Sequence, residues 1–159
     1  MKHLKPKKIY RILFPVLLAA LLAVLLSVYF RPLPFPVIGE SDQLTITWTE
    51  MGVRNGEPYM DTGDFYEFTP EQRSSIQNLL SRYTYCRTAS TLFSRNFFSS
   101  GHQLLYLFVF NDGYNLHSIQ ISSAGELAVN GRNYRMKHAE QFIAQALEIL
   151  SPENAATSS

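Results

Sequence analysis

Carboxylates near residue 60 are the best candidates for chemistry in this sequence. Asp61-Thr62-Gly63 offers a carboxylate next to small residues, and two carboxylates held close together can share a proton. The surrounding stretch holds further acids, at Glu57, Asp64, Glu67 and Glu71. Calcium prefers oxygen ligands of this kind, but the spacing differs from that of an EF-hand loop. We therefore interpret the stretch as a solvated acidic surface.

The Asp61 triplet resembles the active-site motif of aspartic proteases of the retroviral type. In this chain Asp64 follows the glycine, where that family has a small residue, and the expected downstream apolar-apolar-Gly element is missing. A turn between strands explains the same residues equally well. An envelope hydrolase that uses Asp61 is therefore only an alternative, and we predict that the protein is not an enzyme.

Other residues with metal or nucleophilic chemistry are scattered along the chain. His102, His117 and His138 form no pair at metal-ligand spacing, and no serine-hydrolase, zinc-protease or phosphate-loop motif is present. We predict no metal and no cofactor. Cys86 is the only cysteine, which excludes an internal disulfide. We expect a buried thiol, and an intermolecular or reactive one is the alternative.

Two groups of residues could contact a partner. The aromatic residues Phe93, Phe97 and Phe98 predict a partner surface, because exposed aromatic side chains anchor interfaces; a loop folded back on the sheet edge is the alternative. The basic residues Arg132, Arg135 and Lys137 could bind an anionic wall polymer or lipid headgroups. Charges that protect a strand edge explain this basic patch better.

The N-terminal sequence predicts a membrane anchor. A basic leader at 1–11 precedes the uncharged segment 12–30, which at about 1.5 Å per residue would nearly span a bilayer. The bulky exit Val28-Tyr29-Phe30-Arg31 favours an uncleaved signal-anchor over a cleaved signal peptide. From Arg31 onward, nine Lys or Arg stand against thirteen Asp or Glu. This charge pattern predicts a single-pass protein of the cell membrane with a cytoplasmic N-terminus, an extracytoplasmic domain and no nucleic-acid partner.

Composition then divides the rest of the chain. Residues 31–37 alternate proline with larger residues, which predicts an extended linker. An α+β domain is expected over 38–150, followed by a disordered tail at 151–159.

The periodicity within this domain predicts a two-layer sandwich of a mainly antiparallel sheet and two amphipathic helices. Strands are expected at 44–49, around 59–68, at 104–110 and at 116–121, with a possible short edge strand at 91–93. Thr69 and Gln72 form a capping box that begins the first helix, and apolar residues at helical spacing predict the second over 139–150. Asn130-Gly131 predicts a type I′ hairpin that pairs Leu127 with Tyr134. The run LLYLFVF at 104–110 suits a central strand covered on both faces, or one whose aromatic residues face solvent.

The order of these segments resembles small exported domains of Gram-positive bacteria, lipoprotein-like or single-pass. The resemblance rests on the layout of "TPEQRSSIQNLLSRY", "LLYLFVFNDG" and "GELAVNGRNYRM", and the acylated Cys of the lipoproteins is missing. It implies a bacterial cell-surface location and no catalytic residues. We predict a binding or accessory module for a protein or envelope component, with a structural subunit of a membrane complex as a further alternative.

Overall fold

The computed structural model describes residues 6–93, 101–111 and 114–151, except for the side chains of residues 6–12 and 115. The chain forms two compact units that divide between Arg31 and Pro32. The predicted disordered tail and the first residues of the predicted leader lie outside the described residues, apart from Ser151.

The N-terminal unit contains one helix, α1 (Pro6–Tyr29), whose side chains are exposed from Leu13 to Val28. Among the residues that the structure describes, no helix is both long enough and apolar enough to cross a membrane. This finding contradicts the predicted transmembrane helix at 12–30, together with the signal-anchor and the single-pass membrane localisation that followed from it.

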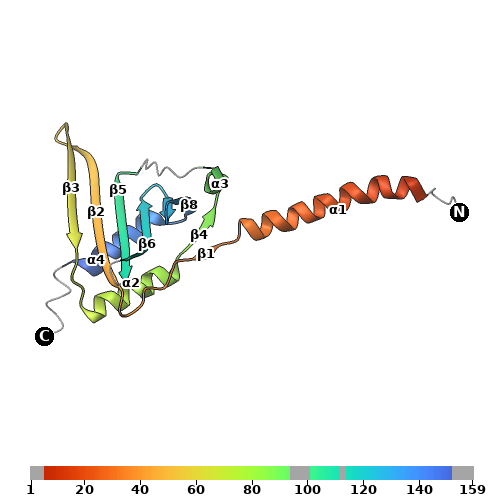
Figure 1. The fold of residues 1–159 in the computed structure, drawn as a ribbon. Coiled ribbons are helices and arrows are strands. Elements are labelled where there is room, and N and C mark those ends of the chain that lie inside the picture. Colours follow the sequence, from red (N-terminus) through yellow and green to blue (C-terminus); the bar gives the residue numbers. More distant parts are fainter. Residues whose placement is uncertain (1–5, 94–100, 112–113, 152–159) are drawn as a thin grey trace. The chain divides into compact units, whose positions relative to one another are not determined.

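The second unit is built on one antiparallel sheet of eight strands (Figure 1). Its order across the sheet is β1-β4-β8-β7-β6-β5-β2-β3. The strands are β1 (Leu33–Pro34), β2 (Gln43–Arg54), β3 (Glu57–Phe65), β4 (Thr84–Arg87), β5 (Gln103–Asn111), β6 (Tyr114–Ser122), β7 (Glu126–Val129) and β8 (Arg132–Met136). The second half is a meander, because β5 to β8 are neighbours in chain order, and β2 and β3 extend it beyond β5.

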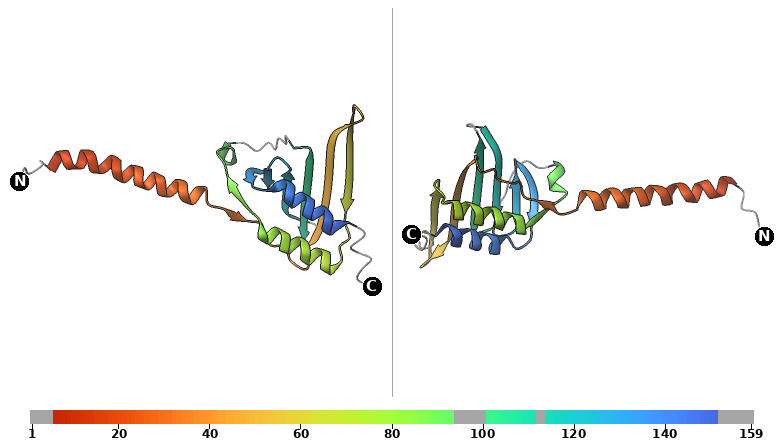
Figure 2. Two further views of the ribbon diagram at one scale, coloured as in Figure 1. Left: turned by 180° about the vertical axis from the view of Figure 1, so that it is seen from behind. Right: turned by 90° about the horizontal axis from the view of Figure 1, so that it is seen from below.

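Helices α2 (Pro70–Arg82) and α4 (Ala139–Leu150) pack against each other on one face of this sheet (Figure 2). The apolar faces of the two helices supply Ile76, Leu80, Phe142 and Ile143, all at most 1% exposed. Together with the apolar sheet residues beneath them, they form a single core. The predicted α+β layers therefore agree with the structure, whereas the transmembrane part of that prediction does not.

Local signals set the ends of these elements. The hydroxyl of Thr69 accepts a hydrogen bond from Gln72 N at 3.2 Å, and the Gln72 side chain accepts one from Thr69 N at 3.0 Å, so the predicted capping box is present. Asn130 and Gly131 have φ angles of 51° and 73°, as a type I′ turn requires. The predicted register of Leu127 with Tyr134 is confirmed.

Three segments differ from their expected structures. The possible edge strand at 91–93 is instead the short helix α3 (Ser90–Phe93), where the Thr91 hydroxyl accepts a hydrogen bond from Thr88 N at 2.8 Å. The Asp61 triplet lies inside β3 rather than in a turn. The predicted linker at 31–37 contains β1, which pairs with β4, and the buried Phe35.

Gly63 explains why β3 continues through the triplet. It lies directly opposite Trp48 on β2, and a Cβ at Gly63 would clash with the indole Nε1 of Trp48. The indole covers the glycine, and this aromatic cover compensates for the missing side chain within the strand.

Candidate binding surface on the sheet face opposite the long helices

The strand β5 has two chemically different faces. Leu105, Leu107 and Val109 are at most 1% exposed and belong to the core under the helices. Side chains alternate along a strand, so Tyr106, Phe108 and Phe110 point to the opposite face, where each is partly exposed. The Phe108 and Phe110 rings stack with centroids 6.3 Å apart and an interplanar angle of 26°. We call Tyr106, Phe108 and Phe110 the aromatic stripe.

Uncharged polar side chains border the aromatic stripe on both sides. On β2, Thr45 lies opposite Phe108 and Thr47 opposite Tyr106. On β6, Ser118 and Gln120 occupy the matching positions. The two long helices α2 and α4 both lie on the other face of the sheet. This face therefore presents aromatic rings within a border of hydroxyl and amide groups, with no charged side chain at those four border positions.

The aromatic stripe ends at an irregularity in the sheet. The register between β5 and β6 shifts between Val109 and Phe110, so that Phe110 pairs with Asn115 and Asn111 with Tyr114. A bulge of this kind increases the local twist and redirects side chains, and it often lies beside a functional surface.

A hydrogen-bonded network braces the outer end of the β2–β3 hairpin. Glu50 accepts hydrogen bonds from the Tyr59 hydroxyl at 2.7 Å and from Gln103 Nε2 at 3.3 Å. These bonds, led by that from Tyr59, lower the pKa of Glu50 below its ordinary value, and the Glu50 carboxylate in turn raises the pKa of Tyr59. The Arg54 guanidinium stacks over the Tyr59 ring, 4.3 Å from its centroid.

Asp61 lies at the edge of this network, opposite Glu50. Its side chain is 52% exposed and forms an ion pair of 3.5 Å with Arg54. An aspartic-protease carboxylate pair instead shares a proton between two facing aspartates. The arrangement around Asp61 gives the hydrolase alternative no support and is that of a surface ion pair.

We expect the Glu50 carboxylate to make a pH-dependent contribution to stability. Its folded pKa lies below the unfolded value, so the stabilisation is present above that unfolded value and is lost as the pH falls through the folded one. Glu50→Gln should therefore lower the melting temperature at pH 7, and the difference from wild type should shrink on acidification below pH ~4.5. Circular dichroism melts from pH 7 to 2.5 test this, with exposed Glu57→Gln as the control. A Glu50→Gln difference that is independent of pH would contradict the expectation.

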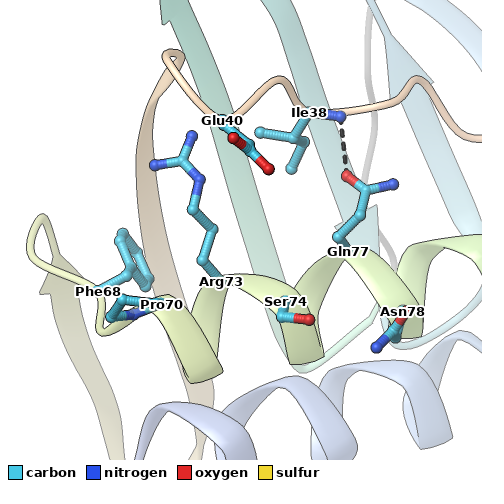
Figure 3. A pocket seen from close by; sticks show the side chains of 8 residues that line it. All are labelled: Ile38, Glu40, Phe68, Pro70, Arg73, Ser74, Gln77 and Asn78. Carbon is cyan, nitrogen blue, oxygen red and sulfur yellow. Dashed lines mark hydrogen bonds between the residues drawn. The ribbon is translucent and has the colours of Figure 1, made fainter.

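A second polar site lies where residues 38–42 approach α2 (Figure 3). Arg73 donates to the carbonyls of Gly39, at 2.9 Å, and Asp42, and Gln77 accepts a hydrogen bond from Ile38 N at 2.8 Å. Between this loop and the helix lies a cavity of about 610 Å³, and a second of about 510 Å³ adjoins it on the Tyr66 side.

Asp42, which is itself part of the loop at 38–42, also stabilises that loop. It is a buried carboxylate that accepts hydrogen bonds from Asn111 Nδ2 at 2.8 Å and from Gly39 N at 2.6 Å. The bond from Asn111, followed by that from Gly39 N, keeps the pKa of Asp42 below its ordinary value. Because Arg73, Asp42 and Asn111 are all bonded to the loop or to one another, this site is a structural latch, and we assign it no ligand.

The predicted partner residues do not come together as one described surface. Phe93, on α3, is 87% exposed, whereas Phe97 and Phe98 lie outside the described residues. The basic residues Arg132, Arg135 and Lys137 are all exposed, but Arg132 and Arg135 are three residues apart on β8 and therefore point to opposite faces. Both groups remain predictions.

The described residues contain no metal-binding constellation. No group of three or more His, Cys, Asp and Glu side chains in that part of the chain could hold a metal ion. Cys86 is half-buried on β4, opposite Arg135, rather than fully buried as expected.

The sequence predicted the strand that carries the aromatic stripe, but it did not decide whether both faces of that strand are covered or the aromatic residues face solvent. The signal was the alternation of aromatic Tyr106, Phe108 and Phe110 with aliphatic Leu105, Leu107 and Val109. Aliphatic residues belong to the face that the helices cover, and aromatic residues with partly exposed rings suit an accessible one.

The fold and the surface together define a small α+β domain with an antiparallel sheet covered by two long helices on one face. No protein-family model, curated protein or solved structure matches the chain. The resemblance to exported Gram-positive domains therefore remains a prediction.

Proposed function

We propose that this domain is a binding module that captures a protein partner across the aromatic stripe. The observation that carries the proposal is the set of partly exposed rings of Tyr106, Phe108 and Phe110 on the face opposite α2 and α4. Interface centres are enriched in aromatic residues and depleted of charge, and polar groups lie around them. The threonine, serine and glutamine side chains beside the stripe supply such a border.

A protein is the partner that these features favour. Stacked rings supply rigid apolar area at a low cost in side-chain entropy, and the surrounding hydroxyl and amide groups can bond to a backbone. The stripe has little charge of its own, which does not suit a polyanion. Binding without chemistry also agrees with the exposed, paired state of Asp61.

Site-specific crosslinking tests this function. We expect a photoreactive phenylalanine at position 108 to capture one defined protein in cells, and the same group at Asn78, which is exposed on α2, to capture none. The purified partner should then bind Tyr106→Thr/Phe110→Thr at least tenfold more weakly, because truncating interface aromatics commonly costs more than 1 kcal/mol each.

Threonine is the replacement of choice because it favours strands and already occupies the neighbouring positions on β2. A circular dichroism melt must show that the double variant is folded. A folded variant with unchanged affinity for the captured protein would refute the assignment of the stripe. A parallel crosslinker at Phe93 tests the predicted aromatic surface by the same readout.

A further inference from the structure

The strand β3 leaves one long side of the sheet unpaired. It is the last strand in the sheet order and pairs only with β2. This pairing is continuous and without a bulge from Ile46–Phe65 to Arg54–Glu57. The opposite end of the sheet is the two-residue β1. The nine-residue β3 is therefore the edge with room for another strand.

The turn at Asn55-Gly56 determines which backbone groups face outward. Both residues have positive φ angles, 56° and 86°, so the two-residue hairpin closes on Arg54 and Glu57 as a hydrogen-bonded pair. Bonded and non-bonded positions alternate along an antiparallel pair. The N–H and C=O groups of Met60, Thr62 and Asp64 consequently point away from β2. In the described part of the chain, no backbone hydrogen bond satisfies them.

Three usual protections of an edge strand, which are lysine, a bulge and a central proline, are missing from β3, and its charged side chains are all acidic. Edges are commonly blocked by lysine, by a bulge or by proline. Here the segment 57–67 contains no Lys or Arg, and its proline, Pro58, lies beside the turn. The segment's charge comes from Glu57, Asp61, Asp64 and Glu67. Met60 and Tyr66 are exposed large side chains on the same segment.

This charge selects the kind of strand that can pair. Two copies joined along β3 would bring two sets of three carboxylates, those of Glu57, Asp61 and Asp64, to one seam. Like charges across strands are destabilising, so a second copy is disfavoured. Glu57 and Asp61 lie on one face of β3, and Met60 and Asp64 lie on the other. A strand with Lys or Arg at alternating positions would complement Glu57 and Asp61, with apolar residues between them for Met60. Arg54 does not neutralise the other carboxylates of this segment, because its guanidinium is already paired with Asp61.

We infer that β3 accepts an extended basic segment of the partner protein as a ninth strand. This inference rests on the proposed function, because it names the part of the partner that the module holds. Main-chain hydrogen bonds to Met60, Thr62 and Asp64 provide the affinity, and alternate side chains provide the selectivity. The rest of the partner lies across the adjoining aromatic face.

A designed peptide tests the edge even before the partner is identified. The probe is a capped nine-residue peptide of alternating lysine and valine, titrated into the isotope-labelled full chain by NMR. The amide signals of Met60, Thr62 and Asp64 should shift, and their hydrogen exchange should slow at saturation. The matching glutamate–valine peptide, and a lysine–valine peptide N-methylated at alternate residues, should bind at least tenfold more weakly. Equal binding by the N-methylated peptide would overturn the inference.

Thr62→Pro is the decisive variant, because it removes an outward N–H and leaves the pairing with β2 intact. It should weaken lysine–valine binding at least tenfold, whereas Thr62→Val should not, and melts verify that both are folded. Unchanged binding by folded Thr62→Pro would overturn the inference. Self-association of the wild-type chain that Thr62→Pro abolishes would also overturn it, in favour of a second copy. The two proposals can also fail separately. If Tyr106→Thr/Phe110→Thr abolishes partner crosslinking from position 108 but Thr62→Pro does not change it, the pairing at β3 is refuted and the proposed function of the aromatic stripe is retained.

Discussion

Phe142→Ala is expected to lower the free energy of unfolding by about 3–5 kcal/mol. Phe142 is 1% exposed on α4, and its ring stacks near Phe35 at 6.0 Å and meets Tyr83 edge-on at 5.2 Å. Alanine would remove these contacts and leave a cavity between α4, Phe35 and Tyr83. The loss is comparable with the whole stability of a small domain, about 5–15 kcal/mol.

Urea unfolding followed by circular dichroism measures this change. Phe142→Leu preserves most of the side-chain volume and should cost much less than the alanine variant. Gln141→Ala, at the exposed neighbouring position on α4, should change the free energy of unfolding by less than about 0.5 kcal/mol. A loss below about 1 kcal/mol for Phe142→Ala would show that the aromatic cluster is not part of the cooperative core.

Gly125→Ala is expected to destabilise the domain by about 2–4 kcal/mol. Gly125 has a φ angle of 90°, and a Cβ there would lie 2.8 Å from the backbone oxygen of Met136. Its N–H bonds to Ser122 O at 2.9 Å and its carbonyl accepts from Met136 N at 2.9 Å, so the backbone cannot move away without losing both. The substitution therefore adds a steric clash to the strain of a positive φ.

Gly131→Ala separates these two costs. Gly131 also has a positive φ angle, 73°, but nothing lies within 4 Å of a Cβ built there. Only the conformational strain remains, about 1–2 kcal/mol. Urea denaturation of both variants should thus rank Gly125→Ala well below Gly131→Ala in stability. Equal losses would mean that β7 and β8 absorb the clash by a small shift.

Local sequence signals predicted the elements whose determinants lie close together in the chain. Thr69 and Gln72 are three residues apart, and Asn130-Gly131 needs only its flanking strands. β1 escaped prediction because a proline-rich segment of two paired residues has no periodicity, and its partner β4 is distant in the chain. The continuation of β3 through Gly63 depends on Trp48 across the hairpin, which no local pattern reveals.

The candidate surface also depends on contacts between segments that are distant in the chain. Alternation along β5 showed that its two faces differ, but which face the helices cover depends on where α2 and α4 pack. In the latch, Asp42 is 31 positions from Arg73 and 69 positions from Asn111. No local sequence motif predicts contacts between residues so far apart. The uncharged run before Arg31 predicted a membrane span from its composition, and the described helix α1 does not meet that requirement.

The pairing of β1 with β4 has a mechanical consequence. Tension applied to the chain at Arg31 reaches β1 first. This strand is held to β4 by two residue pairs, Leu33 with Tyr85 and Pro34 with Thr84. A ladder of two residue pairs contributes few hydrogen bonds, so the initial resistance is small. The load then falls on Phe35, whose ring lies 5.0 Å from that of Tyr85, and next on the bond between Ile38 N and Gln77. The domain thus yields to traction from its N-terminal side in graded steps, and the other seven strands stay shielded until β1 and the latch have been released.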